Sequence, residues 1–543
     1  MKAGIMTPET CNKTIVRKTG VGRRGVTPAK GLTCLASIAA LMLGGCRVGP
    51  KYVVPSAPAP PEFKESSPAA YDKAPDGTWQ PAKPQDAMLK GKWWEVFNEP
   101  ELNALEDQLD INNQNIAEYF QNFMAARALV REAKSQYYPT VTTDPSFTRQ
   151  KSPGTLRNSG LTSGTTTGTT GTTGVTTNGG TTSTVISLPF DVSWEPDLWG
   201  KIRNTVREYQ YATQVSAADL ENERLTEQAD LAEYYFQLRG QDSLQDLYNK
   251  TIEADQKALD LTKALYETGI DSDESVAQAE VTLENAQEVG SGIATNRAIY
   301  EHAIAMLIGK PASSFSMPVK GLSTPVPSIP LGVPSQLLQR RPDIAAAERT
   351  MAEANAVIGV ETAAYYPTLS LTGGGGLESS AIGTLFSAPA LFWSAGASAS
   401  ETIFDAGLRR ATIAQYTATY NADVASYRQT VLTAFQQVED YIATVRVTSQ
   451  QITQEDTAVK SAQRYLDIAT SRYQTGLDPY LNVISAQTTL LSDQQTQVTL
   501  RVNEITAAVE LVQALGGGWD TTQLPAASKV TTSGAEKQVA GTP

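Results

Sequence analysis

Few residues of this chain could carry covalent or metal chemistry. The 543 residues include one histidine, His302, and three cysteines, Cys11, Cys34 and Cys46. They form neither a CxxC pair nor a zinc-site spacing, and His302 lies in an Ala/Ile-rich stretch typical of a packed or surface helix. The GxSxG, HExxH and Walker motifs are missing, and the carboxylates lack an evident partner set. We therefore expect no catalytic residue, no cofactor and no metal site.

Cys46 is the one cysteine whose surroundings indicate a modification. A basic start is followed by an apolar run at 32–43, LTCLASIAALML. Its twelve residues would span only about 18 Å as a helix, too short to cross a bilayer but typical of a signal peptide. The run ends in LGGC at 43–46, which resembles a bacterial lipoprotein box. We expect cleavage after residue 45 and lipidation of Cys46, with a generic export signal as the alternative.

The residues after Cys46 indicate a destination and a tether. Arg47 follows in place of Asp, and by resemblance to enterobacterial lipoproteins this favours the outer membrane over the inner one. The segment 46–92 begins Pro-rich and should run extended. No later segment offers about 18 uninterrupted apolar residues, so we expect no transmembrane helix.

The net charge argues against a nucleic-acid partner. The whole chain carries a formal charge of −13. The leader at 1–45 holds seven Lys and Arg against one Glu, a net of +6, so its removal leaves −19. Such a field repels phosphate backbones.

The chain contains the same unit twice. Residues 200–309 align on 407–516 without a gap at an offset of 207, and 126–140 align on 354–368 at an offset of 228. The 21-residue difference is explained by an insert, because twenty of the residues 160–184 are Thr or Gly. We expect a tandem duplication with a mobile loop at 150–184.

Each copy is expected to contain a helix, a strand, a loop, a strand, a very long helix, a turn and a shorter helix. Residues 408–475 hold no Gly or Pro and could run for roughly 100 Å. Apolar residues recur there every seventh position from Val424 to Tyr473, which predicts supercoiling against neighbouring helices. Gly240 should weaken the corresponding helix of the first copy.

The strands carry the alternation of a membrane barrel. The stretch ISLPFDVSWE (186–195) alternates apolar with polar residues, and we expect its apolar side chains to face lipid: Ile186, Leu188, Phe190, Val192 and Trp194. An ordinary half-buried sheet would give the same pattern. Partners are expected at 391–404 and after Pro139 and Pro367. Four strands cannot close a barrel, whereas three chains would supply twelve.

The order and spacing of several motifs resemble the TolC-like outer-membrane efflux ducts, in the lipoprotein branch that serves RND-type multidrug efflux systems. These motifs are CRVGPKYVVP (46–55), WWEVFNEPELNAL (93–105), LQRRPDI (338–344), QYYPT, AYYPT, YETGI and YQTGL. The resemblance implies a mainly α protein with a small β part. It also implies a homotrimer that forms a 12-stranded β-barrel on a 12-helix α-barrel tunnel, anchored to outer-membrane lipid and extending through the periplasm.

The resemblance also implies a function and a domain order. It implies a passive exit duct for drugs or other small molecules, which partners with a periplasmic adaptor (membrane fusion) protein and an inner-membrane efflux transporter. The expected parts are a leader (1–45), a lipidated tether (46–92), repeat 1 (93–310), an equatorial linker (311–342), repeat 2 (343–517) and a disordered tail (518–543).

Each TG turn is expected to reverse a long helix into a shorter one, with Gly269 and Gly476 supplying a positive φ. By resemblance, these tips would dock the adaptor through Thr268, Gly269, Ile270, Thr475, Gly476 and Leu477. Candidates for a periplasmic gate are Asp271, Asp273, Glu274, Asp478, Asn482 and Ser485, with plain solvated turn residues as the alternative. A protein-secretion duct of type I and a long-helix scaffold lipoprotein remain alternative functions.

Overall fold

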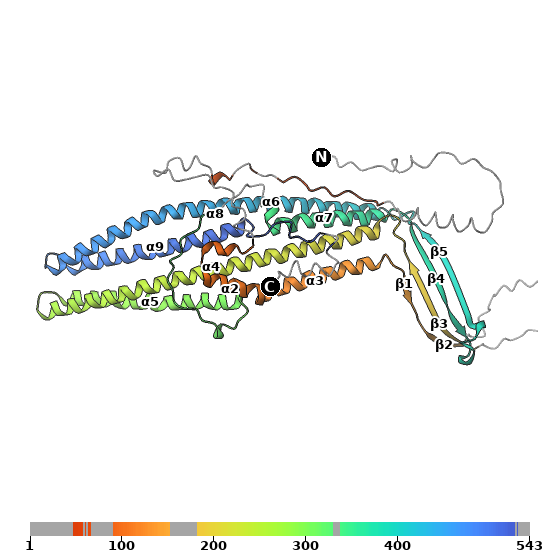
Figure 1. Cartoon of the computed structure of the whole chain (residues 1–543), viewed down its shortest axis with the longest axis horizontal. Coiled ribbons are helices and arrows are strands. Elements are labelled where there is room, and N and C mark those ends of the chain that lie inside the picture. Colours follow the sequence, from red (N-terminus) through yellow and green to blue (C-terminus); the bar gives the residue numbers. More distant parts are fainter. Residues whose placement is uncertain are drawn as a thin grey trace, which may run out of the picture.

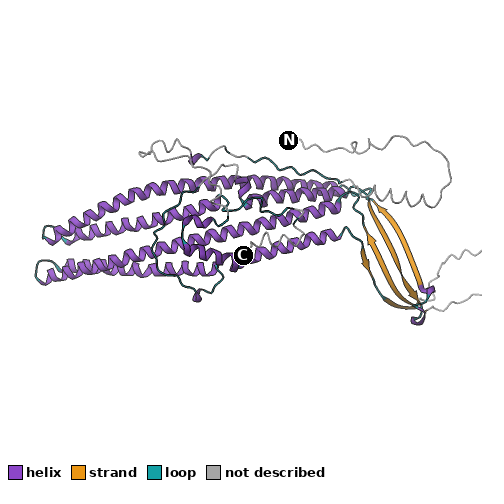
Figure 2. Cartoon of the chain, viewed as in Figure 1, coloured by secondary structure: helices purple, strands orange, loops and turns teal. Residues whose placement is uncertain are grey.

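The computed structural model describes residues 47–57, 60, 63–66, 91–151, 182–329, 337–526 and 529. The protein consists of an elongated bundle of helices with a small sheet at one end (Figure 1). Figure 2 shows that the α-helices and the strands occupy opposite ends of the long axis, with only short 3-10 turns at the tip of the sheet between β4 and β5. None of the described helices is apolar enough along its length to cross a membrane. The leader and Cys46 lie outside the described residues.

The helices occur in matching pairs. Two have 67 residues, α4 (Lys201–Glu267) and α8 (Leu408–Gln474), and two have 35, α5 (Asp273–Leu307) and α9 (Tyr480–Ala514). Two more have 22, α3 (Gln114–Ser135) and α7 (Pro342–Ala363). The other helices among the described residues are α2 (Pro100–Asn112) and α6 (Leu337–Arg340), with short 3-10 turns at Lys64–Ser66, Trp93–Phe97, Ala312–Ser314, Ile382–Thr384 and Ala388–Ala390. The long helices begin and end 207 residues apart, as the offset predicts.

Local sequence explains where these helices begin. Pro342 occupies the first turn of α7, where its missing N–H costs nothing, and Asp343 beside it pairs with Arg341 at 2.7 Å. The side chain of Asn113 caps α3 by accepting from the backbone N–H groups of Asn115 and Ile116. All eight positions of the seven-residue repeat in α8 are buried or half-buried, so this stripe faces the bundle.

The expectation that Gly240 weakens α4 relative to Ala stays a prediction, and the structure adds a packing reason for the glycine. The helix runs through it without a break, and a Cβ built on Gly240 would lie 2.4 Å from Cγ2 of Val502 in α9. Glycine therefore permits a close approach of the two helices.

The sheet is antiparallel throughout. Its strands are β1 (Thr140–Thr142), β2 (Ser146–Lys151), β3 (Thr182–Trp194), β4 (Thr368–Ser379) and β5 (Leu391–Ser400). Both β1 and β2 pair with β3, as two parts of one strand line interrupted near Pro145. The order across the sheet is therefore β1/β2, β3, β4, β5, which gives four strand positions.

Three expected boundaries are corrected. Strands β2 and β3 continue to Lys151 and Thr182, so they contain residues that we expected in the loop at 150–184. Strand β5 ends at Ser400 instead of 404.

The expected disorder of the tail is wrong for 518–526, because Trp519 is buried and the N–H of Thr521 donates to the Gln339 carbonyl at 2.8 Å. Burial of this one tryptophan accompanies an ordered segment, although the residues around it are polar. The tail beyond residue 529 lies outside the described residues.

Candidate functional site

The register of the sheet separates two chemically different faces. The five residues expected to face lipid, Ile186 to Trp194 in alternation, lie on one face of β3. Paired residues share a face, so the register adds these side chains to it: Val141, Phe147, Leu371, Leu377, Leu391 and Trp393. The opposite face carries Asp191, Ser193, Thr372 and Ser394. Several aromatic side chains of the apolar face, including Trp393, are exposed to solvent in the single chain.

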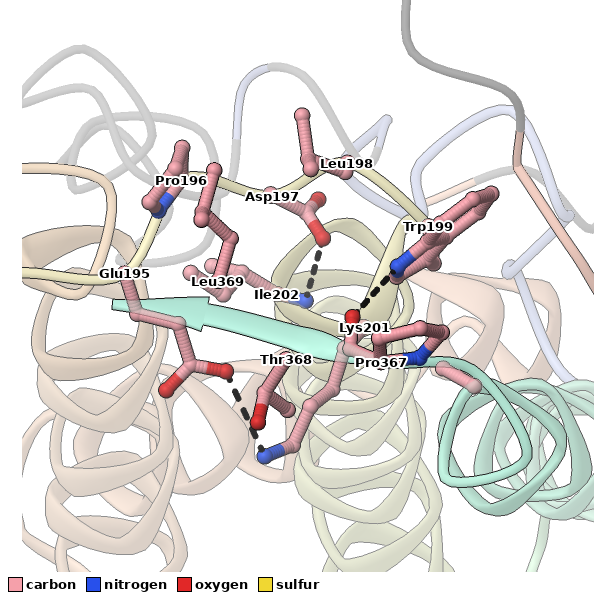
Figure 3. Close-up of a pocket in the computed structure, with 11 residues that line it drawn as sticks. Glu195, Pro196, Asp197, Leu198, Trp199, Lys201, Ile202, Pro367, Thr368 and Leu369 are labelled. Atoms are coloured by element: carbon pink, nitrogen blue, oxygen red, sulfur yellow. Dashed lines mark hydrogen bonds and ion pairs between the residues drawn. The ribbon is translucent and has the colours of Figure 1, made fainter. Parts of the chain in front are cut away.

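The junction between sheet and helices is built around Trp199 (Figure 3). Its indole N–H donates to the carbonyl of Pro367 at 2.7 Å, and its ring stacks on Tyr366 with centroids 4.8 Å apart. The carboxylate of Asp197 accepts from the backbone N–H groups of Ile202 and Arg203, at 3.2 and 3.0 Å, and so caps α4. These contacts connect the first repeat to the second where the strands end.

The N-terminal segment is bound along the helices. At the junction, the N–H of Val48 donates to the Trp199 carbonyl at 3.1 Å. Further along, the hydroxyl of Tyr52 donates to Glu348 on α7 at 2.5 Å. At its far end, the backbone N–H groups of Lys64 and Glu65 donate to Glu439 on α8 at 2.7 and 3.0 Å. Glu65 also pairs with Arg446. The extended tether therefore begins at the sheet and follows the bundle.

A buried ionic network holds the linker to the middle of the bundle. Asp242 is fully buried and receives two guanidinium groups, Arg239 at 3.1 Å and Arg297 at 2.6 Å. Arg239 also donates to the Pro318 carbonyl at 2.7 Å, and Arg297 donates to the Met317 carbonyl at 2.9 Å. Sequence reasoning missed this network, because its partners are distant in the chain, as for Arg239 and the Pro318 carbonyl, which lie 79 residues apart.

The two helical tips lie together at the end of the bundle opposite the sheet (Figure 1). They have the same hydrogen bonding. In the first, Gly269 N–H donates to the Tyr266 carbonyl and Ile270 N–H donates to the Leu265 carbonyl, both at 2.9 Å. In the second, the N–H groups of Gly476 and Leu477 repeat this pattern at 2.8 and 2.9 Å. This is the Schellman motif, and it requires the positive φ of +73° and +72° that the two glycines adopt.

The docking candidates all lie on these turns. The hydroxyls of Thr268 and Thr475 bond back to carbonyls of the preceding helical turn. The side chains of Ile270 and Leu477 are 70% and 68% exposed, so each tip presents one apolar side chain to solvent. Apolar groups at a solvent-facing tip suit contact with another protein.

Among the gate candidates, Asp271 joins the two hairpins. Its carboxylate accepts from the hydroxyl of Tyr473 on α8 at 2.5 Å and from that of Ser275 at 2.7 Å. Burial opposes its ionisation, but these bonds and the Ser272 N–H outweigh burial, so the pKa of Asp271 is lowered. Burial and the bond to Asp271 raise the pKa of Tyr473 to about 12.

The other gate candidates are not brought to this contact. Asp478 pairs with Arg472 of its own hairpin at 2.6 and 3.0 Å, and hydrogen bonds from Arg472 and then Asn482 lower its pKa. Asp273 and Glu274 are exposed in the first turn of α5. Ser485 is exposed one turn into α9. Sequence reasoning missed Tyr473 as a partner of Asp271. The only signal was the alignment of the two repeats, which places a tyrosine before each turn, Tyr266 and Tyr473.

Comparisons with known proteins agree with this arrangement. The model of the outer membrane efflux protein family matches residues 105–310 and 333–517. The chain is 30% identical over 493 residues to the probable efflux pump outer membrane protein TtgC of Pseudomonas putida KT2440, which covers 90% of this chain and 96% of that protein. It is 28% identical over 486 residues, 89% of this chain and 96% of that protein, to the pyoverdine export outer membrane protein OpmQ of Pseudomonas aeruginosa.

Solved structures share the fold. The outer-membrane channel OprN is 27% identical with a TM-score of 0.75, over 87% of this chain and 100% of that one. The Campylobacter jejuni CmeC outer membrane channel is 21% identical with a TM-score of 0.76, over 89% of this chain and 97% of that one. The chain therefore belongs to the outer membrane efflux protein family and is an outer-membrane efflux channel.

Proposed function

We propose that three copies of the chain assemble into the exit duct of a tripartite efflux pump. The twelve strand positions of the trimer would close one barrel in the outer membrane, and its helices would form a tunnel across the periplasm. Small molecules would pass through it from an inner-membrane transporter and a periplasmic adaptor. The chain supplies walls, a gate and docking surfaces, while the transporter supplies the energy.

The unpaired edges of the sheet carry this proposal. Among the described residues, β1 and β2 on one side and β5 on the other have no strand beyond them. In lipid an open edge leaves backbone groups unsatisfied at several kcal/mol each, so a spanning sheet must close. Edge-to-edge pairing of three copies closes it with the apolar face outward. The polar face, with Asp191 and Ser193, then lines a wet interior.

The length of the helices supports a tunnel. At 1.5 Å per residue the 67 residues of α4 and of α8 reach about 100 Å, well beyond the thickness of a bilayer. We take 93–310 and 343–517 as the two repeats, with 311–342 as the equatorial linker.

The tips are assigned to docking and gating. Thr268, Gly269, Ile270 and their counterparts Thr475, Gly476 and Leu477 form the surface for the adaptor. The bond from Tyr473 to Asp271 holds adjacent hairpins together, and its separation widens the mouth.

Lipidation of Cys46 fits the same arrangement. Arg47, the next residue, lies against Gly200 at the strand–helix junction, where a Cβ on that glycine would be 3.1 Å from the Arg47 Cα. An acyl chain on Cys46 would therefore enter the membrane at the level where the strands end.

The substrates are proposed to be small organic molecules. The named relatives include a toluene efflux pump protein, a solvent efflux pump protein, an antibiotic efflux pump protein and a pyoverdine export protein. These compounds share neither size nor charge, which suits a duct without a selective binding pocket. No described feature favours secreted proteins as cargo, and the relatives favour efflux.

Native mass spectrometry of the chain extracted from outer membranes tests the assembly. We expect a trimer of chains that start at Cys46 and carry acyl mass. A monomer without acyl mass would contradict both the shared barrel and the anchor. Substrate export is tested separately, by comparing solvent and antibiotic tolerance of cells with and without the gene.

A further inference from the structure

We infer that, in the proposed trimer, Tyr266 of each copy donates a hydrogen bond to Asp478 of the adjacent copy. Six tyrosine–aspartate contacts would then close the ring of tips, three within chains and three between chains. This inference rests on the proposed function, because it requires the trimer.

The first argument is the equivalence of the two donors. Tyr266 and Tyr473 lie 207 residues apart and occupy the same position in the same Schellman turn, since each carbonyl accepts from the glycine three residues later. Identical backbone geometry directs both rings sideways from their hairpins. Tyr473 meets the neighbouring hairpin of its own chain and is 8% exposed, whereas Tyr266 is 48% exposed. Among the described residues, the Tyr266 ring is therefore left half-exposed on the side of the first hairpin that corresponds to the covered side of the second.

The second argument is the equivalence of the two acceptors. Asp271 and Asp478 also lie 207 residues apart, each two residues after the turn glycine. Each receives a hydrogen bond from the side chain four residues later, Ser275 for Asp271 and Asn482 for Asp478. The carboxylate of Asp478 is therefore held by a local hydrogen bond in the same way as that of Asp271. The pairing with Arg472 keeps it ionised and leaves carboxylate lone pairs for a further donor.

The third argument is the direction of the contacts, each of which would run from the tyrosine of one repeat to the aspartate of the next. Within the chain, the tyrosine of repeat 2 reaches the aspartate of repeat 1. Around a ring in which the repeats alternate, the same step leads from the tyrosine of repeat 1 to the aspartate of repeat 2 in the next copy. A second copy of this chain is therefore the occupant that the exposed side of Tyr266 fits.

The two kinds of contact differ in strength. Tyr473 packs on Tyr480 with ring centroids 5.2 Å apart and lies 3.5 Å from the hydroxyl of Thr262. By the offset of 207, the counterpart of Tyr480 is Asp273, and the counterpart of Thr262 would be Ala469 of the adjacent copy. These residues offer no ring and no hydroxyl. The charge of Asp273 also disfavours a second carboxylate nearby. The contacts between chains should therefore separate before those within chains when the mouth opens.

Cysteine cross-linking in the full-length protein tests the pairing. The tyrosine side chain holds the two Cβ atoms too far apart for a disulfide, so a short bismaleimide is the reagent. The variant Y266C/D478C is treated in outer membranes and resolved on a denaturing gel. The matched control is Y473C/D271C, whose two positions touch within one chain. Each single variant controls for reaction through Cys46.

We expect covalent dimers and trimers from Y266C/D478C, in yields several-fold above the single variants. Y473C/D271C should lose its free thiols and still migrate as a monomer. If native mass spectrometry finds a trimer while Y266C/D478C gives no product between chains, the pairing is wrong and the trimer stands. If no trimer forms, the proposed assembly fails together with the pairing.

Discussion

The hydroxyl of Tyr473 lies 2.5 Å from a carboxylate oxygen of Asp271, and this bond between residues 202 positions apart joins the ends of two helical hairpins. Its donor belongs to the second repeat and its acceptor to the first. The gap that it bridges is the one that must widen if the tips move apart.

Replacing Tyr473 with Phe should loosen the tips without unfolding the bundle. A hydrogen bond to a charged group contributes about 1.5–3 kcal/mol, so amide exchange at residues 471–480 should accelerate about 10- to 100-fold. Hydrogen exchange measured by mass spectrometry checks this, and single-channel conductance should rise. The control is Y465F, because Tyr465 is an exposed tyrosine on the same helix. Equal exchange in both variants would contradict the role of the bond.

Replacing Asp242 with Ala should be destabilising, because Arg239 and Arg297 lose their shared buried carboxylate. Breaking a buried ion pair costs up to about 3–5 kcal/mol, and the pairs that Arg239 keeps with Glu101 and Arg297 keeps with Glu301 reduce this loss. Asp246, one turn further along α4, pairs with Lys250 in solvent, so D246A should cost less than about 1 kcal/mol. Chemical denaturation of both variants measures the difference, and similar losses would argue against the network.

Two glycine-to-alanine substitutions test which effect determines stability at Gly240, the close approach of the helices or the helix propensity of the residue. Alanine there gains about 1 kcal/mol of helix propensity but forces a methyl group against Val502, and overpacking costs about 1–3 kcal/mol. We expect G240A to be less stable than the wild type. A Cβ on Gly292 of α5 meets nothing within 4 Å, so G292A should be more stable by about 1 kcal/mol. Thermal unfolding of the two variants should therefore shift in opposite directions.

Glu106 should make the protein less stable as the pH rises. Both carboxylate oxygens are buried without a hydrogen-bond partner among the described residues, and burial, followed by the nearby Asp110 and Asp107, raises the pKa of Glu106 well above its usual value. Above the ordinary glutamate pKa the unfolded chain releases this proton while the folded chain keeps it. Stability contributed by the protonated group therefore falls with rising pH until the folded pKa is reached.

The variant E106Q isolates this effect. Its melting temperature should exceed that of the wild type by more at pH 7.5 than at pH 5. The exposed Glu118 supplies the control, and E118Q should show no such pH dependence. A constant difference between E106Q and wild type across this range would mean that Glu106 is already ionised in the fold.

Much of the architecture could be predicted because it depends on local signals. Gly269 and Gly476 identify the turns, since only glycine readily adopts the φ that the hydrogen bonding requires. The alternation from Ile186 to Trp194 assigned these residues to one face, and the register agrees. Family membership confirms an outer-membrane efflux channel and not an enzyme. The barrel, the trimer, the lipid and the roles of the tips stay predictions.

The features that sequence reasoning missed depend on distant partners. Nothing near Tyr473 indicates Asp271, and its place in an apolar seven-residue repeat suggested only packing. Trp519 looked isolated in a polar tail because the residues that bury it, Ala218, Ala345 and Ala346, lie far back in the chain. Gly240 looked like a defect because the side chain that requires it, Val502, belongs to another helix.

The course of the described residues 47–57 and 63–66 along α7 and α8 has a consequence for the order of assembly. With Cys46 lipidated, these residues tie the helical bundle to the membrane surface before any strand is inserted. The strands of one chain are then confined close to the bilayer, and their search for the membrane becomes an intramolecular step at high effective concentration. Copies held on the same surface would also meet in two dimensions instead of three, so the proposed anchor would affect the rate of the proposed trimerisation as well as location.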